Sequence, residues 1–204
     1  MFKKLASDAL GLSDIGKIIP PSDYDKTDAD DYVMNEDNEK IYFLIKTKQD
    51  EYCFTNLSII HVDGESAVSS KRTLHRYPYM QHRISNVYLE TAGKVDLDIE
   101  IKFSIDNQVI SIDVKKDQID QLKDLYKALL RIAEINYENG LYTDMAHTSL
   151  DKAAAILQQS RYTDGTLDET YKKLTEFGFD WLTSTKSKYH AHDFGAVYEK
   201  YINN

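Results

Sequence analysis

An alternating run near the middle of the chain constrains the fold more than any other feature. Between positions 95 and 103 apolar residues occupy every second place, and the residues between them are Asp, Asp, Glu and Lys. Successive side chains of a strand point to opposite faces, so this pattern predicts a strand with one buried face and one wet face. Such strands are typical of antiparallel sheets.

The segments on either side of this run alternate in the same way. Residues 84–91 and 109–114 predict two more strands, and residues 92–94 and 106–107 predict the turns between them. Gly93 in the first turn can adopt a positive φ without steric cost. The three strands together predict an antiparallel meander.

An amphipathic helix is expected after the meander. Asp117 is a suitable N-cap, and the residues that follow recur at helical spacing until about Glu138. The pair Asn139-Gly140 is a common helix end, so we expect the helix to stop there. The expected apolar stripe consists of Ile119, Leu122, Leu125, Tyr126, Leu129, Ile132 and Ala133.

Four further strands are expected before the meander. They cover residues 41–45, 51–56, 57–62 and 71–77, with a polar loop at 65–70. Seven antiparallel strands followed by one helix predict a fold that is mainly β plus α, a seven-stranded pleckstrin-homology-like barrel capped by its C-terminal helix.

The expected domain organisation has three parts. Residues 1–40 form an amphipathic helix and an acidic connector, residues 41–139 form the barrel, and residues 140–204 form a helical extension. The helix at 2–12 packs on the domain or on a neighbouring subunit, since Lys3 and Lys4 give a membrane anchor little charge. The acidic residues of 23–39 fail the spacing of a calcium loop and predict a solvated connector.

The extension predicts three helices with many aromatic residues. They cover about 141–160, 166–182 and 193–202, with a break at 163–165 and a capping box at Thr166 and Glu169. Short helices cannot bury this much aromatic surface alone, so they must pack on each other, on the barrel helix or on another subunit. A tetratricopeptide pair with its turn at Gly140 is a second interpretation, but no second copy of the repeat follows.

Charge and composition exclude several classes of partner. The net charge of -9 argues against nucleic acid and makes contact with an anionic membrane unexpected. Cys53 is the single cysteine, so no intramolecular disulfide forms, and its apolar neighbours predict a buried thiol. The chain shows neither a segment of transmembrane length nor a signal peptide, so a cytoplasmic location is expected.

No arrangement of residues predicts catalysis. His190 and His192 form a pair without the third and fourth ligands of a metal site. A glycine-rich phosphate loop and a nucleophile elbow are both absent from the sequence. We therefore expect no enzyme activity, no cofactor and no metal.

Two groups of basic residues are the candidates for a ligand site. They could hold a phosphate-bearing headgroup near the first hairpin or the barrel mouth, although acidic neighbours weaken them. The candidates are Lys46, Lys48, Lys71, Arg72 and Arg76.

Three segments carry a resemblance to a known family. The chain resembles the bacterial pleckstrin-homology-like proteins, formerly a domain of unknown function, in residues 50–56, in Tyr77-Pro78-Tyr79 and most specifically in 84–103. Leu57-Ser58 departs from a basic pair that is frequent in the family. The remainder is similar to the helical extension of YvbH-like members, described as an oligomerisation region.

The resemblance implies a function that spacing and composition do not show. It implies a non-enzymatic scaffold or interaction module that binds itself, in several members as rings, with the helical tail as interface and a possible second protein as partner. The alternative is a module that binds a peptide or a lipid headgroup at the barrel mouth or the first hairpin.

Overall fold

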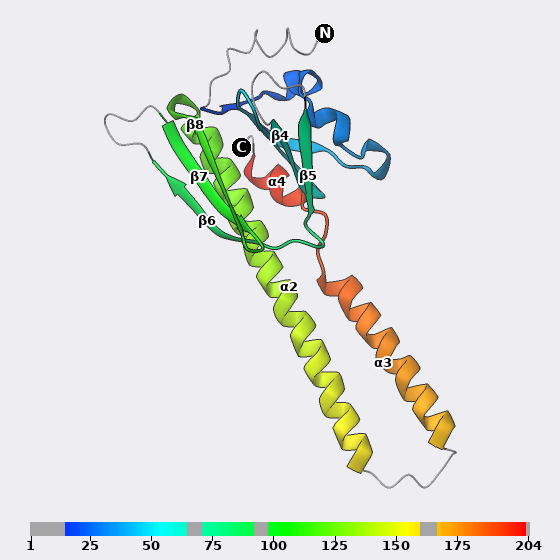
Figure 1. Cartoon of the computed structure of the whole chain (residues 1–204). Helices are drawn as coiled ribbons and strands as arrows, with labels where there is room; N and C mark the ends of the chain where they lie inside the picture. The colour runs from blue at the N-terminus through cyan, green and yellow to red at the C-terminus, as the bar shows by residue number, and fades with distance from the viewer. Residues whose placement is uncertain (1–14, 65–70, 92–97, 160–166, 203–204) are drawn as a thin grey trace. The chain divides into compact units, whose positions relative to one another are not determined.

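The computed structural model describes residues 15–64, 71–91, 98–159 and 167–202 of the chain. Two compact units are present (Figure 1). Residues up to Glu134 together with those from His192 onward form one unit, and Ile135–Ala191 form the other. We call the first the sheet unit and the second the helical hairpin.

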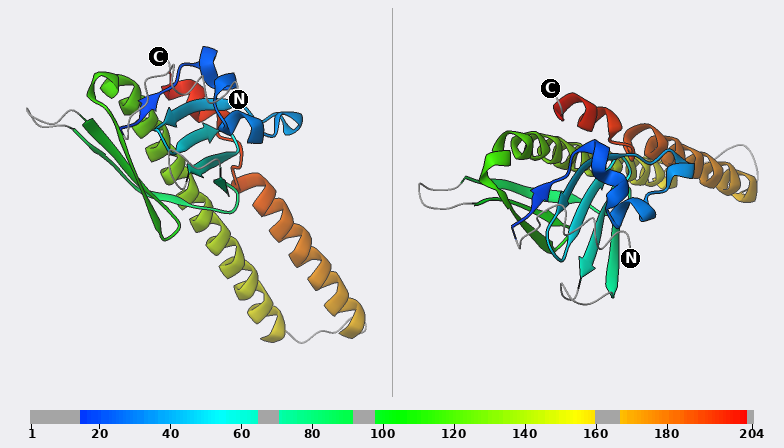
Figure 2. Two further views of the ribbon diagram at one scale, coloured as in Figure 1. Left: turned by 45° about the horizontal axis from the view of Figure 1, so that its top comes forward. Right: turned by 90° about the horizontal axis from the view of Figure 1, so that it is seen from above.

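The sheet unit contains eight described strands in two antiparallel sheets. One sheet has the order β1-β2-β3-β4-β5 and the other β6-β7-β8. Figure 2 shows the sheets at an angle to each other, with the first part of α2 along their open side. The strands are β1 (Lys17–Ile18), β2 (Ile41–Lys46), β3 (Glu51–Thr55), β4 (Ser58–Gly64), β5 (Arg72–Pro78), β6 (Ile84–Glu90), β7 (Asp98–Ile105) and β8 (Gln108–Lys115).

The predicted count of seven strands is one too low. The additional strand is β1, whose two residues are too few to alternate visibly, and it pairs with the end of β2. An isolated bridge between Gly16 and Val114 links this edge to β8. Within the described residues β5 and β6 end their sheets without pairing with each other, so the expected single barrel is two sheets.

The meander is formed as the alternation predicts. Ile101 lies opposite Ile112, and Phe103 lies opposite Ile110, all on the buried face. Asp106 turns the chain between β7 and β8 with φ 52°, and its carboxylate accepts a hydrogen bond from the Arg83 amide at 2.9 Å. The predicted turn at 92–94, the loop at 65–70, the N-terminal helix at 2–12 and the break at 163–165 lie outside the described residues.

Helix α2 runs from Ile119 to Gln159, far beyond its predicted end. The stripe at its start is confirmed, since Leu122, Leu125, Leu129 and Ile132 are fully buried. The predicted stop at Asn139-Gly140 is wrong, because a glycine costs a helix only about 1 kcal/mol and packing overrides that preference. The continuous helix also removes the turn that a tetratricopeptide pair would need.

Both faces of the first sheet are covered. On one face the Phe54 ring meets Phe103 of the other sheet edge-on, with ring centroids 6.1 Å apart. On the other face a cluster that includes Cys53 packs against Ala29 and Val33. Cys53 is therefore buried as predicted, and burial raises the pKa of its thiol.

The acidic segment is part of this fold. Three short 3-10 helices form in it, η1 (Pro21–Lys26), η2 (Ala29–Tyr32) and η3 (Asn35–Asp37), and Ala29 is fully buried. The prediction of a solvated connector is wrong, because Ala29 and Val33 of this segment pack on the sheet and the carboxylate of Glu39 is buried.

The last helix, α4 (Gly195–Tyr201), belongs to the sheet unit. It packs beside β2, and Phe194, Tyr198 and Ile202 are buried there. A Cβ on Gly195 would lie 2.9 Å from the Tyr42 hydroxyl, so a larger residue there would have to displace the end of that side chain. The sequence analysis assigned these residues to the helical extension, whereas the structure groups them with the sheets.

Candidate functional site

Three of the five predicted ligand-binding cations already pair with carboxylates of the chain. The ammonium of buried Lys46 pairs with Glu51, and Nη2 of Arg76 lies 2.9 Å from both oxygens of Glu39. Nε of Arg72 lies 3.6 Å from Asp28. The Arg76 and Arg72 contacts hold the acidic segment to the first sheet, and the Lys46 contact joins β2 to β3.

The other two cations, Lys48 and Lys71, are exposed, one in the turn between β2 and β3 and the other just before β5. The structure does not gather the five into one cradle, and their role in binding remains a prediction. Among the described residues, His190 and His192 included, no three His, Cys, Asp or Glu side chains are placed to hold a metal ion.

Glu39 is the centre of a buried hydrogen-bond network that sequence reasoning missed. Its carboxylate accepts bonds from Thr55 Oγ1 at 2.5 Å, Ser58 Oγ at 2.7 Å and the Met34 amide at 2.8 Å, besides the Arg76 contact. Burial alone would raise the pKa of Glu39, but these donors outweigh it and the pKa is lowered. The charged form is thus favoured in the folded state.

We expect this network to make stability depend on pH. A carboxyl whose pKa is lowered by folding stabilises the fold above its unfolded value, about 4.3 for Glu, and the stabilisation is lost as the pH falls through the lowered folded value. Glu39→Gln should lower the free energy of unfolding by about 2 kcal/mol at pH 7, as measured by urea unfolding. At a pH below the folded-state pKa of Glu39 the same substitution should lower it by clearly less. The control Glu36→Gln changes an exposed acid of the same segment, and equal losses at both pH values for Glu39→Gln would contradict the account.

The helical hairpin is the more distinctive surface. It consists of the later part of α2 and of α3 (Leu167–Tyr189), which lie side by side in Figure 1. A Cβ on Gly178 would lie 3.4 Å from the Leu150 side chain, so the helices approach closely there. Ala146 on α2 is also buried, and Leu150 and Trp181 are half-buried.

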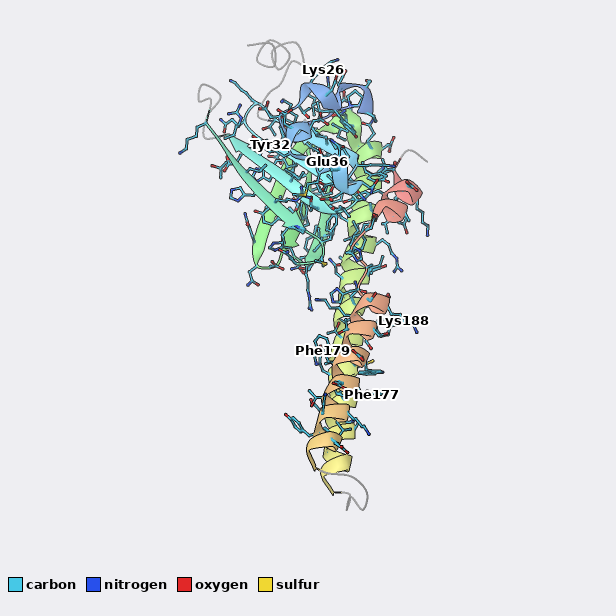
Figure 3. The ribbon with its side chains drawn as sticks, turned by 90° about the vertical axis from the view of Figure 1, so that its right-hand side faces the viewer. Lys26, Tyr32, Glu36, Phe177, Phe179 and Lys188 are labelled. Carbon is cyan, nitrogen blue, oxygen red and sulfur yellow. The ribbon has the colours of Figure 1, made fainter. Side chains whose placement is uncertain are left out.

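The hairpin lacks a hydrophobic core of its own in the part whose burial is described. Its large apolar side chains point into water instead: Phe177 is 65% exposed, Phe179 70% and Tyr171 73%. Figure 3 shows Phe177 and Phe179 along α3. The residues buried there are small or polar, namely Asn136, Asn139, Gly140, Ala146 and Gly178.

A hollow of about 330 Å³ opens between the two helices of the hairpin. The indole of Trp181 forms one wall, and Lys188 carries a positive charge at one end. Its other walls include Tyr142, Met145, Ser149 and Ser184. Its lining is mixed, with Thr185 and Lys188 adding polar groups beside the aromatic rings.

The sequence analysis left three places for the aromatic residues of the extension, and the structure assigns them residue by residue. Phe194 and Tyr198 pack on the sheet unit, and Trp181 is half-buried within the hairpin. Phe177 and Phe179 are 65% and 70% exposed, so the hairpin itself does not bury them.

The fold and this hairpin define a class of protein. The family description "Bacterial PH domain" matches residues 9–133, and "YvbH-like oligomerisation region" matches residues 144–204. The chain belongs to the bacterial PH domain family and carries a YvbH-like oligomerisation region, as the resemblance indicated.

Relatives match both parts of the chain. "Uncharacterized protein YvbH" of Bacillus subtilis is 70% identical over all 204 residues of both chains. A crystal structure of a PH-domain-containing protein from Exiguobacterium sibiricum is 53% identical, covers 93% of this chain and 100% of that one, and superposes with a TM-score of 0.84. "Uncharacterized protein YjqA" of Bacillus subtilis is 31% identical over 99 residues, 47% of this chain and 76% of that protein.

No helix among the described residues is both long and apolar enough to cross a membrane. The longest, α2, has polar and charged residues throughout its length.

Proposed function

We propose that this protein is a non-enzymatic interaction module that binds copies of itself through its helical hairpin. One observation carries the proposal: the hairpin exposes Phe177, Phe179 and Tyr171, and the residues it buries, where burial is described, are small or polar. Large exposed apolar side chains on a segment with little core of its own are candidates for contact with another chain. The family description of the same segment as an oligomerisation region supports the choice of a second copy as partner.

The two units have separate tasks in this proposal. The sheet unit is a stable platform, because both faces of its first sheet are covered and α4 adds a further buried layer. The hairpin supplies the contact between chains and leaves the edges of the sheets for a further protein. A cytoplasmic homo-oligomeric scaffold is the resulting function.

The proposal predicts that only changes in the hairpin alter the mass of the assembly. Light scattering of the full chain should give a multiple of 23.5 kDa, and the double variant Phe177→Ser with Phe179→Ser should shift dissociation to at least tenfold higher concentration. Aromatic side chains dominate interface energies, which is why two substitutions suffice.

The matched control lies on the sheet unit. Tyr88 and Val109 are 60% and 69% exposed there, so the double variant Tyr88→Ser with Val109→Ser removes similar apolar surface. We expect its mass to equal that of the unaltered chain. Loss of assembly in this control, with an unchanged hairpin variant, would place the interface on the sheets and refute the proposal.

A further inference from the structure

The last helix is held on the sheet unit by two buried aromatic side chains. Phe194 and Tyr198, about one helical turn apart, are 1% and 0% exposed. The ring of Phe194 meets that of Tyr79 edge-on with centroids 5.1 Å apart, and the ring of Tyr198 stacks on Tyr42. The hydroxyl of Tyr42 also donates a hydrogen bond to the carboxylate of Glu199 at 2.9 Å. Helix α4 is thus seated in an aromatic site that the sheet unit provides.

Asn56 fixes the chain where it enters α4. Its backbone carbonyl accepts a hydrogen bond from the Phe194 amide at 2.8 Å, and its Nδ2 donates one to the carboxylate of Asp193 at 2.9 Å. Asn56 is 5% exposed, and its Oδ1 accepts a further bond from the Lys40 amide at 2.8 Å. One buried side chain therefore joins the start of β2 to a segment that lies 137 positions after it.

Helix α3 has much less support from its own packing. Gly178 is the one buried residue among those of α3 whose burial is described. A helix in a protein gains most of its stability from packing rather than from propensity. The chain joins α3 to α4 through few residues, because α3 ends at Tyr189 and Phe194 is already seated on the sheet unit. The docked α4 therefore limits how far the end of α3 can move.

We propose that α4 is a strap: its docking on the sheet unit keeps α3 beside α2, and its release lets α3 separate from α2 while the sheets stay folded. The physical reason is entropic. A held end leaves α3 fewer positions away from α2, so the close contact between Gly178 and Leu150 costs less entropy to form. The contact of Phe54 with Phe103 between the two sheets involves no residue of α4, so it can persist when α4 is released.

A disulfide that can be closed and opened tests the strap in the full chain. A Cβ on Gly195 would lie 3.5 Å from the Cβ of Asn56, a separation that a disulfide can span. The double variant Asn56→Cys with Gly195→Cys therefore has α4 fastened when oxidised and free to leave when reduced, while native Cys53 is fully buried. Hydrogen exchange of the backbone amides, followed by mass spectrometry and corrected for intrinsic rates, compares the two states of one chain.

Release of α4 should loosen α3 and leave the sheets folded. We expect the α3 amides to exchange at least tenfold more slowly in the oxidised chain than in the reduced one. In the reduced chain they should exchange at least tenfold faster than the amides of β7 and β8. Equal exchange of α3 in the two states would show that α3 opens without α4, and equal exchange of α3 and β7 in the reduced chain would show that both open only by global unfolding. Either result would overturn the inference.

Substitution of a strap residue tests the same point without added cysteines. Phe194→Ala removes a buried ring and should make the α3 amides exchange at least tenfold faster than in the unaltered chain. The matched control Tyr201→Ala removes a half-exposed ring of α4 and should change that exchange less than threefold. Equal effects of the two substitutions would count against the strap. The inference concerns contacts within one chain, so a chain with the mass of one copy at every concentration would refute the proposed function and leave the strap standing.

Discussion

Replacing Tyr198 by alanine is expected to destabilise the sheet unit by about 3–5 kcal/mol, the usual cost of removing a buried aromatic side chain. Tyr198 is fully buried, and its ring stacks on Tyr42 with centroids 5.3 Å apart. Its hydroxyl bonds to the hydroxyl of Tyr79, which is also buried. Burial raises the pKa of both phenols, so both stay protonated and can share this bond.

Two variants show whether packing or the hydroxyl causes this loss. Tyr198→Phe keeps the ring but leaves the Tyr79 hydroxyl without this partner, and should cost about 1–2 kcal/mol. Tyr201→Ala removes a half-exposed ring of the same helix, and should cost less than 1 kcal/mol. Urea unfolding followed by circular dichroism measures all three; equal losses for Tyr198→Ala and Tyr201→Ala would contradict the account.

This prediction affects how the oligomerisation region is dissected. The matched region, residues 144–204, includes α4, whose buried residues belong to the sheet unit. A chain truncated near Gly140 would lose the hairpin and also uncover Tyr79 and Tyr42. Point substitutions in the hairpin therefore separate assembly from folding better than truncation does.

Glu51→Leu is the second substitution from which we expect a loss of about 3–5 kcal/mol, because it leaves a buried charge without its partner. Glu51 lies on β3 with 3% of its surface exposed, and pairs with the ammonium of Lys46. The same carboxylate accepts hydrogen bonds from the amides of Asp28 at 3.1 Å and Ala29 at 2.7 Å. One side chain thus neutralises a lysine and fastens η2 to the sheet.

The double variant Lys46→Met with Glu51→Leu separates these two roles. Removing both charges should restore part of the stability, because a buried ion pair gains little over apolar residues of similar size. The part that is not restored measures the loss of the carboxylate that accepts hydrogen bonds from the Asp28 and Ala29 amides. If Glu51→Leu alone is no less stable than the double variant by urea unfolding, Lys46 finds water or another partner and the account is wrong.

Alternation predicted the sheets well because it reports directly on burial. Phe103 and Ile101 are buried at the positions that the period of two assigns to them, and Leu122 and Leu129 do the same for the first part of α2. The strand pattern and the helix pattern both depend only on which residues are buried when the chain folds.

The features that the sequence did not reveal depend on contacts between distant positions. Arg76 looks like a surface cation along the chain, but it pairs with Glu39, 37 positions away, once the acidic segment folds back onto the sheet. Tyr198 meets Tyr79 across 119 positions. Local composition cannot show such pairs, and for the same reason Asn139-Gly140 was taken for a helix end.

The hairpin surface was predictable in part. The aromatic excess of the extension indicated a need for further packing, and that need is visible in the exposure of Phe177 and Phe179. The hollow beside Trp181 was not predictable, because it depends on how closely α3 approaches α2 at Gly178.

Sedimentation equilibrium of the unaltered full chain over a wide range of concentration tests the central claim most directly. Self-association through the hairpin predicts a mass that is a multiple of 23.5 kDa and falls to that of one chain on dilution. A mass of one chain at every concentration, with the fold intact by circular dichroism, would contradict the claim.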